Sequence, residues 1–198
     1  SVAYTEKPDA MSFLREWTAL AESGSGERGI FNREAAVKQA HKNGRRDPNF
    51  EWGTNPCSEI ILRGPKTDKS GNPIAGTGGQ FCNLSEVVIR ATDSKEDLIR
   101  KVRVATILGT VQSTYTKFPY LRKVWAKNTA EERLLGVSLT GIMDNTLTNG
   151  KEGDLAVLLE DLKQVAVDTN KEWADKLGIE VSAAITCVKP SGTVSQLT

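Results

Sequence analysis

The chain has 198 residues, of which 38% are hydrophobic and 26% charged, as in an ordinary soluble globular protein with one sizeable core. The formal net charge is only +1, which gives no electrostatic reason to expect binding to nucleic acid or to an anionic membrane. Three cysteines do not make a secreted disulfide framework, and the chain shows neither a bilayer-spanning apolar run nor a signal peptide. We therefore expect a cytoplasmic location.

The N-terminal part predicts two helices followed by extended and loop segments. Pro8-Asp9 opens a helical pattern that ends at residues 23–26, and Asn32 is placed to cap a second helix. Residues 55–62 predict an extended segment. Residues 64–79 are rich in glycine and proline and predict a flexible loop or a hairpin insertion.

The C-terminal part predicts strands that alternate with long helices. Expected strands lie at residues 81–89, 134–139 and 181–188. Expected helices follow a capping box at Ser94-Lys95-Glu96-Asp97, then Pro119, then Gly153-Asp154. This alternation predicts an α/β fold with a largely parallel sheet or barrel. The charged run Glu131-Glu132-Arg133 predicts a solvated helix face.

The most informative stretch of the sequence is Asn55-Pro56-Cys57-Ser58-Glu59-Ile60. In an extended segment alternate side chains share a side, so Asn55, Cys57 and Glu59 are expected to project together. Pro56 would stiffen the approach to the thiol. An amide, a thiol and a carboxylate on one wall of a pocket suit chemistry at a sugar or another polyhydroxylated carbon.

The other two cysteines lie in expected strands. Cys82 stands in the block Phe81-Cys82-Asn83-Leu84-Ser85-Glu86-Val87, where packing in the strand core is the alternative to a chemical role. Cys187 lies in an apolar strand and is expected to be a core residue without a role. No metal site is expected, because the cysteines are far apart in sequence and His41 is the only histidine.

Three blocks in this order, residues 55–60, 81–87 and 189–193, closely resemble the adenosylcobalamin-dependent ribonucleoside-triphosphate reductases, as do residues 29–33 and 132–143. The resemblance spans essentially the whole chain. It implies a catalytic barrel of ten strands, in two antiparallel halves of five parallel strands, with a central finger loop that carries a radical cysteine at its tip. The expected fold is therefore α/β, a partial ten-stranded barrel of the ribonucleotide reductase type. We expect residues 1–198 to be a single piece of that barrel, cut from a longer protein.

The resemblance also implies roles for individual residues. Cys57 matches the cysteine that becomes a thiyl radical and abstracts the ribose 3′-hydrogen, and Glu59 matches the carboxylate that takes the 3′-hydroxyl proton. Asn55 matches the amide that hydrogen-bonds the substrate hydroxyls. Cys82 matches one of two thiols that reduce the 2′-position, and its partner is expected outside this chain. The turn expected to hold the substrate phosphates comprises Pro190, Ser191, Gly192 and Thr193.

The function implied is reduction of ribonucleoside triphosphates to deoxyribonucleotides for DNA synthesis, with adenosylcobalamin as cofactor and thioredoxin or a similar dithiol as reductant. One alternative is a di-iron-dependent reductase that acts on diphosphates and has a separate radical-generating subunit. Another is an inactive module that only binds nucleotide phosphates. These 198 residues alone are expected not to turn over, because they lack the second thiol and part of the barrel.

Overall fold

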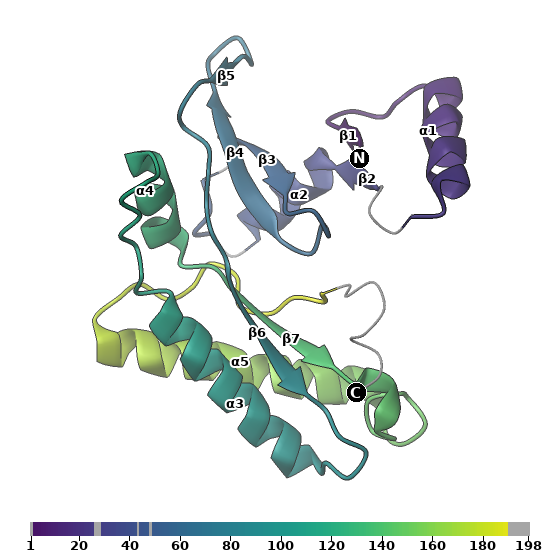
Figure 1. Cartoon of the computed structure of the whole chain (residues 1–198), viewed down its shortest axis with the longest axis vertical. Helices are drawn as coiled ribbons and strands as arrows, with labels where there is room; N and C mark the ends of the chain where they lie inside the picture. The colour runs from purple at the N-terminus through teal and green to yellow at the C-terminus, as the bar shows by residue number, and fades with distance from the viewer. Residues whose placement is uncertain (1, 26–28, 43, 48, 190–198) are drawn as a thin grey trace. The chain divides into compact units, whose positions relative to one another are not determined.

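The computed structural model describes residues 2–25, 29–42, 44–47 and 49–189 (Figure 1). Helices and strands both occur, so the α/β class expected from the sequence is confirmed. The chain divides into two compact units, Ser1–Gly79 and Gln80–Thr198, and each is described by itself. Within the described residues, no helix is long and apolar enough to cross a membrane.

The first unit combines short strands with two helices (Figure 1). Its elements are β1 (Val2–Tyr4), α1 (Ala10–Ser23), β2 (Ile30–Asn32), α2 (Arg33–His41), β3 (Phe50–Thr54), β4 (Ile61–Thr67) and β5 (Pro73–Ile74). Strands β1 and β2 pair in parallel, whereas β3, β4 and β5 form an antiparallel sheet. The β4–β5 hairpin overlaps residues 64–79, for which the sequence predicts a loop or a hairpin, although β4 already begins at Ile61.

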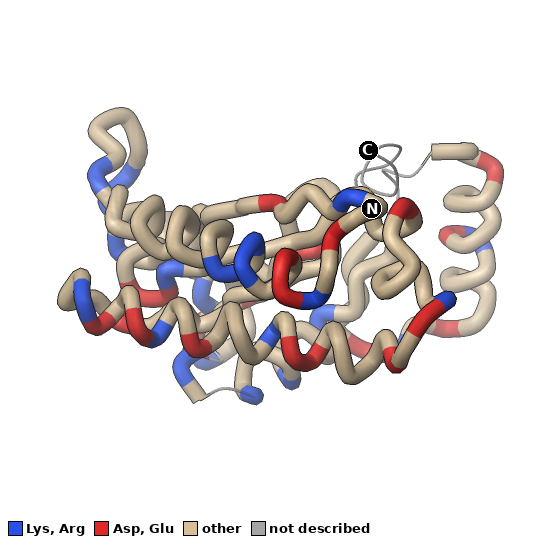
Figure 2. Tube along the Cα trace, turned by 90° about the horizontal axis from the view of Figure 1, so that it is seen from below, with Lys and Arg blue, Asp and Glu red and all other residues tan. Residues whose placement is uncertain are grey.

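The second unit is a parallel strand pair backed by helices (Figure 1). Its elements are β6 (Asn83–Val88), α3 (Lys95–Gln112), α4 (Lys123–Glu132), β7 (Leu135–Thr140), the 3₁₀ helix η1 (Ile142–Asp144) and α5 (Leu155–Leu177). The core joins β6, β7, α3 and α5 through Val87, Ile89, Leu98, Val102, Ala105, Val137, Leu158, Leu162 and Ala166. Acidic and basic residues are interspersed along the trace (Figure 2).

Four helices begin where the sequence predicts, and each has the predicted capping residue at its start. The side chains of Asp9, Asn32, Ser94 and Asp154 each accept hydrogen bonds from backbone N–H groups in the first turn of their helix. Asp97 completes the capping box with Ser94. Such a cap satisfies N–H groups that have no partner inside the helix, which makes helix starts readable from local sequence.

The predicted strand at residues 181–188 does not form as a regular strand. The segment runs beside β7 but makes one isolated parallel bridge, between Val137 and Thr186. Leu135 and Val137 stand two residues apart on β7, yet their N–H groups donate to the adjacent carbonyls of Ala184 and Ile185. This unequal spacing interrupts the ladder in the manner of a β-bulge.

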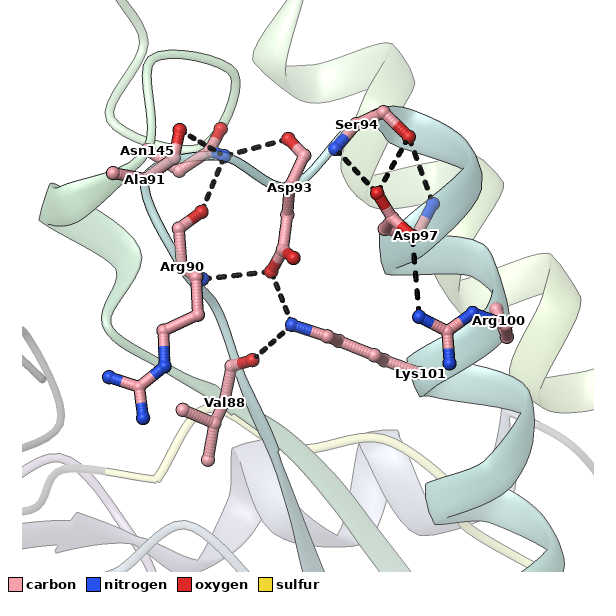
Figure 3. Close-up of polar contacts among 9 residues, drawn as sticks. All are labelled: Val88, Arg90, Ala91, Asp93, Ser94, Asp97, Arg100, Lys101 and Asn145. Carbon is pink, nitrogen blue, oxygen red and sulfur yellow. Dashed lines mark hydrogen bonds and ion pairs between the residues drawn. The ribbon is translucent and has the colours of Figure 1, made fainter.

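A single buried amide ties the turn after β6 to the segment after η1 (Figure 3). The Asn145 Nδ2 donates to the carbonyls of Arg90 and Asp93, both at 2.9 Å, and to that of Ala91 at 3.4 Å. Its Oδ1 accepts from the Leu147 N–H at 2.9 Å. Asn145 is only 1% exposed, so its own amide group has no ready access to water as a substitute partner.

The Asn145→Asp variant should therefore be markedly less stable. It replaces the donating amide with a carboxylate that faces carbonyl oxygens, and we expect a loss of about 3 kcal/mol of unfolding free energy in urea. Asn49→Asp is the matched control, because Asn49 is exposed and should change stability by less than about 0.5 kcal/mol. Equal unfolding midpoints for the two variants would contradict this account.

Asp93 gives the same turn a dependence on pH (Figure 3). Burial of its carboxyl, which is 10% exposed, raises its pKa, but hydrogen bonds from Lys101 Nζ and the Arg90 N–H outweigh that effect. The net pKa of Asp93 lies below its ordinary value of 3.8. A depressed pKa adds stability above the unfolded-state pKa, and that stability is lost as the pH falls through the folded-state pKa.

We therefore expect the unfolding free energy to fall on acidification below about pH 4. Asp93→Asn should be less stable by about 2 kcal/mol at pH 7 and should show a shallower fall in acid. Chemical denaturation at a series of pH values measures both effects. Parallel pH profiles for the variant and the wild type would count against this role of Asp93.

Candidate functional site

Cys57 lies in the connection between β3 and β4, which pair antiparallel with Thr54 opposite Ile61. The prediction of an extended segment here is wrong. The Ser58 N–H donates to the Asn55 carbonyl at 3.0 Å, and Ser58 has a φ of 63°. Asparagine at the first position of a β-turn and proline at the second are both favoured, because proline already has the φ that the turn needs.

The turn places Cys57 at its third position, where the thiol is exposed. Side chains do not alternate in a turn as they do in a strand. The expectation that Asn55, Cys57 and Glu59 project to the same side therefore loses its basis. The Asn55 Oδ1 instead accepts from the Ile60 N–H at 3.2 Å and closes the connection. Six residues thus hold a free thiol at the tip of a tight hairpin.

Glu59 carries the least satisfied polar group of this hairpin tip. Both of its carboxylate oxygens are buried, and neither has a hydrogen-bond partner within the described part of the chain. Burial of a carboxylate without a partner is costly, and native proteins avoid it unless something else completes the site. A ligand with hydroxyl groups would supply the missing donors.

The base of the hairpin is firmly anchored. Trp52 of β3 is fully buried with Phe50 and the helix α2, and the Arg46 guanidinium lies 4.3 Å from its ring centroid. The Arg46 Nη2 also donates to the Ile61 carbonyl at 2.8 Å, at the first residue of β4. The side chain of Arg46 therefore links both strands that carry the cysteine turn.

Cys82 belongs to the second unit and stands directly before β6. Its Sγ lies 3.6 Å from the point that a Cβ atom on Gly136 would occupy, and the Cys187 Sγ lies 3.1 Å from the same point. Gly136 is on β7, opposite Leu84 in the parallel register. The structure thus brings together two thiols that stand more than one hundred residues apart, although the sequence assigned no role to Cys187.

The segment in front of Cys82 is held by α4. Glu132 is fully buried and accepts from the Gln80 Nε2, so the prediction that it lies on a solvated face is wrong. The Phe81 N–H donates to the Thr129 Oγ1 at 3.1 Å. Glu132 is the last residue of α4, where the chain turns into β7, and its partner Gln80 is distant in sequence. The charged residues next to Glu132 in the sequence therefore do not predict that its side chain is buried.

The predicted phosphate turn, Pro190, Ser191, Gly192 and Thr193, lies outside the described residues. The approach to these residues is described as far as Lys189. The Lys189 N–H donates to the Ser138 Oγ on β7 at 3.3 Å. A cavity of about 640 Å³ adjoins this approach, between α5, β7 and residues 186–189, with Cys187 on its wall. Among the described residues, no cluster of His, Cys, Asp or Glu is placed to hold a metal ion.

The fold of this chain matches part of a solved structure. The chain superposes on a crystal structure of a B-12 dependent (class II) ribonucleotide reductase with a TM-score of 0.63 and 22% identity, over 100% of this chain and 28% of the other. The described α/β arrangement is therefore that of a region of this fold.

Sequence comparison is consistent with the same class, although no protein-family model matches the chain. An adenosylcobalamin-dependent ribonucleoside-triphosphate reductase from Lacticaseibacillus paracasei is 30% identical over all of this chain and 27% of its own length. The enzyme of that name from Lactobacillus gasseri is 29% identical over 87% of this chain and 25% of its own length. The chain is thus a relative of these reductases and spans about a quarter of their length, which confirms the resemblance seen in the motifs.

Proposed function

We propose that the chain forms part of the catalytic barrel of a ribonucleotide reductase that converts ribonucleoside triphosphates to deoxyribonucleotides by thiyl-radical chemistry. The observation that carries the proposal is the hairpin tip, where the exposed thiol of Cys57 stands two residues from the buried, unpaired carboxylate of Glu59. The named relatives favour the cobalamin-dependent class over the di-iron class.

The residues of the hairpin tip divide the first half of the reaction between them. The Cys57 sulfur, as a radical, removes the 3′-hydrogen of the ribose and later returns it. The Glu59 carboxylate accepts the proton of the 3′-hydroxyl, which eases departure of the 2′-hydroxyl as water. General-base help of this kind typically contributes about 10²–10⁴-fold in rate. Asn55 positions the ribose hydroxyls through its amide.

Loss of the 2′-hydroxyl consumes two electrons, and Cys82 supplies them together with a second thiol. The two sulfurs end as a disulfide, which thioredoxin or a similar dithiol reduces by exchange before the next turnover. We also propose that residues 190–193 hold the phosphates of the substrate, the role that the sequence resemblance implies for them.

The sheet geometry supports a barrel interior on the side of Cys82. Ser85 and Val87 of β6 and Val137 of β7 contact the helices, because the Ser85 Oγ donates to the Ala105 carbonyl of α3 and both valines lie in the core. Alternate residues of a strand face opposite ways, so Leu84 and Gly136 face away from these helices. We propose that this second face lines the ten-stranded barrel and that the β3–β4 hairpin is its finger loop.

We propose adenosylcobalamin as the cofactor. When bound, it supplies the radical that starts the reaction, and the protein supplies orientation. Within the described residues, the feature that fits such a cofactor is the Cys57 thiol, which is exposed at the tip of a tight turn and therefore open to approach.

The test is turnover by the complete protein that contains this chain. We expect formation of deoxyribonucleoside triphosphate when a ribonucleoside triphosphate, adenosylcobalamin and dithiothreitol are supplied, with the product measured by chromatography. Product from diphosphates alone, independent of the cofactor, would instead indicate the di-iron class. Phosphate binding without any product would indicate the inactive binding module.

A further inference from the structure

Two thiols meet at one backbone position of the second unit. The point that a Cβ atom on Gly136 would occupy lies 3.6 Å from the Cys82 Sγ and 3.1 Å from the Cys187 Sγ. The sulfurs are therefore no further apart than these two distances together. Glycine leaves the space between them free of a side chain, and any larger residue would also meet Leu84.

The backbone at Cys187 has room to adjust, whereas the segment in front of Cys82 is held by α4. Cys82 precedes the first residue of β6, so it lies just outside the regular ladder with β7. Cys187 is attached to β7 by its N–H, which donates to the Val137 carbonyl at 3.1 Å, but its segment pairs through one isolated bridge. A disulfide needs sulfurs about 2.05 Å apart and a restricted Cα separation. A segment that is not part of a regular strand can shift to meet these requirements more readily than a regular strand can.

Both sulfurs are also within reach of small reagents. Neither Cys82 nor Cys187 is part of a disulfide, and both residues have intermediate exposure. Cys187 in addition lies on the wall of the cavity between α5 and β7. The intermediate exposure of both residues therefore gives a small polar oxidant access to the pair without unfolding of the unit.

We propose that Cys82 and Cys187 form a reversible disulfide when the protein meets a peroxide. One thiolate attacks a peroxide oxygen, the O–O bond breaks, and a sulfenic acid forms with release of water. The second thiol then attacks that sulfur and displaces a second water. In sum, two thiols lose two electrons and two protons, and hydrogen peroxide becomes two waters.

The consequence for activity rests on the proposed function. A disulfide to Cys187 withdraws Cys82 from substrate reduction, so the oxidised enzyme is inactive until a dithiol restores both thiols by exchange. Cys187 would then act as a partner of Cys82 within this chain, outside the catalytic cycle.

Mass spectrometry tests the pairing directly. The protein is treated with hydrogen peroxide, its remaining thiols are blocked with N-ethylmaleimide, and it is digested with trypsin. We expect a disulfide-linked pair made of the peptide 70–90 and the peptide that begins at Leu177. The link should persist in Cys57→Ser and be absent from Cys187→Ser. Blocked Cys82 and Cys187 in folded, peroxide-treated protein, or a link from Cys82 to any other cysteine, would overturn the proposal.

Turnover provides the second readout. Peroxide followed by removal of excess oxidant should inactivate the wild type, and dithiothreitol should restore it, whereas Cys187→Ser should lose this reversible component of inactivation. If the link forms in a protein that never reduces nucleotides, the proposed function fails and the pairing stands. If turnover is present and the link is absent, the pairing fails alone.

Discussion

Replacing Cys57 by serine should reduce ribonucleotide turnover to background and abolish exchange of the ribose 3′-hydrogen. A serine O–H bond is much stronger than a thiol S–H bond, so the hydroxyl cannot take the place of the sulfur as a hydrogen-atom carrier. The thiol is exposed at the tip of a turn, so the substitution should change stability by less than about 0.5 kcal/mol. Hydrogen exchange from 3′-labelled substrate and product formation are the measurements.

Cys82→Ser is the matched control for this prediction. It removes a thiol of the same chain, yet it should stop turnover while 3′-hydrogen exchange continues, because the proposed role of Cys82 comes after the radical step. A Cys57→Ser enzyme that keeps 3′-exchange would show that another group carries the radical. Loss of exchange in both variants would remove the distinction between the two sulfurs.

Glu59→Gln should lower kcat by about 10²–10⁴-fold, the usual worth of general-base catalysis. The same change should leave the protein equally stable or slightly more stable. Both carboxylate oxygens are buried without a partner, and an amide of the same shape removes an unpaired charge from that environment. The kcat value and the urea midpoint are measured on the same preparations.

Glu51→Gln is the matched control for Glu59. Glu51 lies on β3 of the same hairpin, where its carboxylate pairs with Arg33 at 3.3 Å, partly exposed. Loss of such a pair should cost at most about 1 kcal/mol and little activity. Marked destabilisation by Glu59→Gln would assign that carboxylate a structural role and contradict its place in the reaction.

The sequence was sufficient to predict features that depend on neighbouring residues. The starts of α1, α2, α3 and α5 are set by side chains that bond to backbone groups within three residues, so a short window contains all the needed information. Parallel pairing of β6 with β7 follows because a long helical connection joins them. The resemblance of the motifs also named the relatives that the comparisons found.

Geometry at residues 55–60 was harder to predict, because two signals compete there. The spacing of Asn55, Cys57 and Glu59 fits a strand, whereas Asn55-Pro56 fits the start of a turn, and the turn prevails at the end of a hairpin. The motif therefore predicted which residues belong to the candidate site, but it did not predict how the backbone arranges them.

Contacts between distant segments were not predictable from local patterns. Glu132 is buried because Gln80 and Ala183, about fifty residues away on either side, bond to its side chain and carbonyl. Cys187 lies near Cys82 only because Gly136 stands between their segments. Both contacts depend on how distant strands pack, and the residues near Glu132 or Cys187 in the sequence do not predict that packing.

The most direct test of the account is whether the complete protein cleaves the cobalt–carbon bond of adenosylcobalamin through the Cys57 thiol. Its absorbance is followed after mixing with protein, dithiol and a ribonucleoside triphosphate. We expect rapid cleavage with the wild type and with Glu59→Gln, and none with Cys57→Ser. Equal cleavage with Cys57→Ser would contradict the central role of that sulfur.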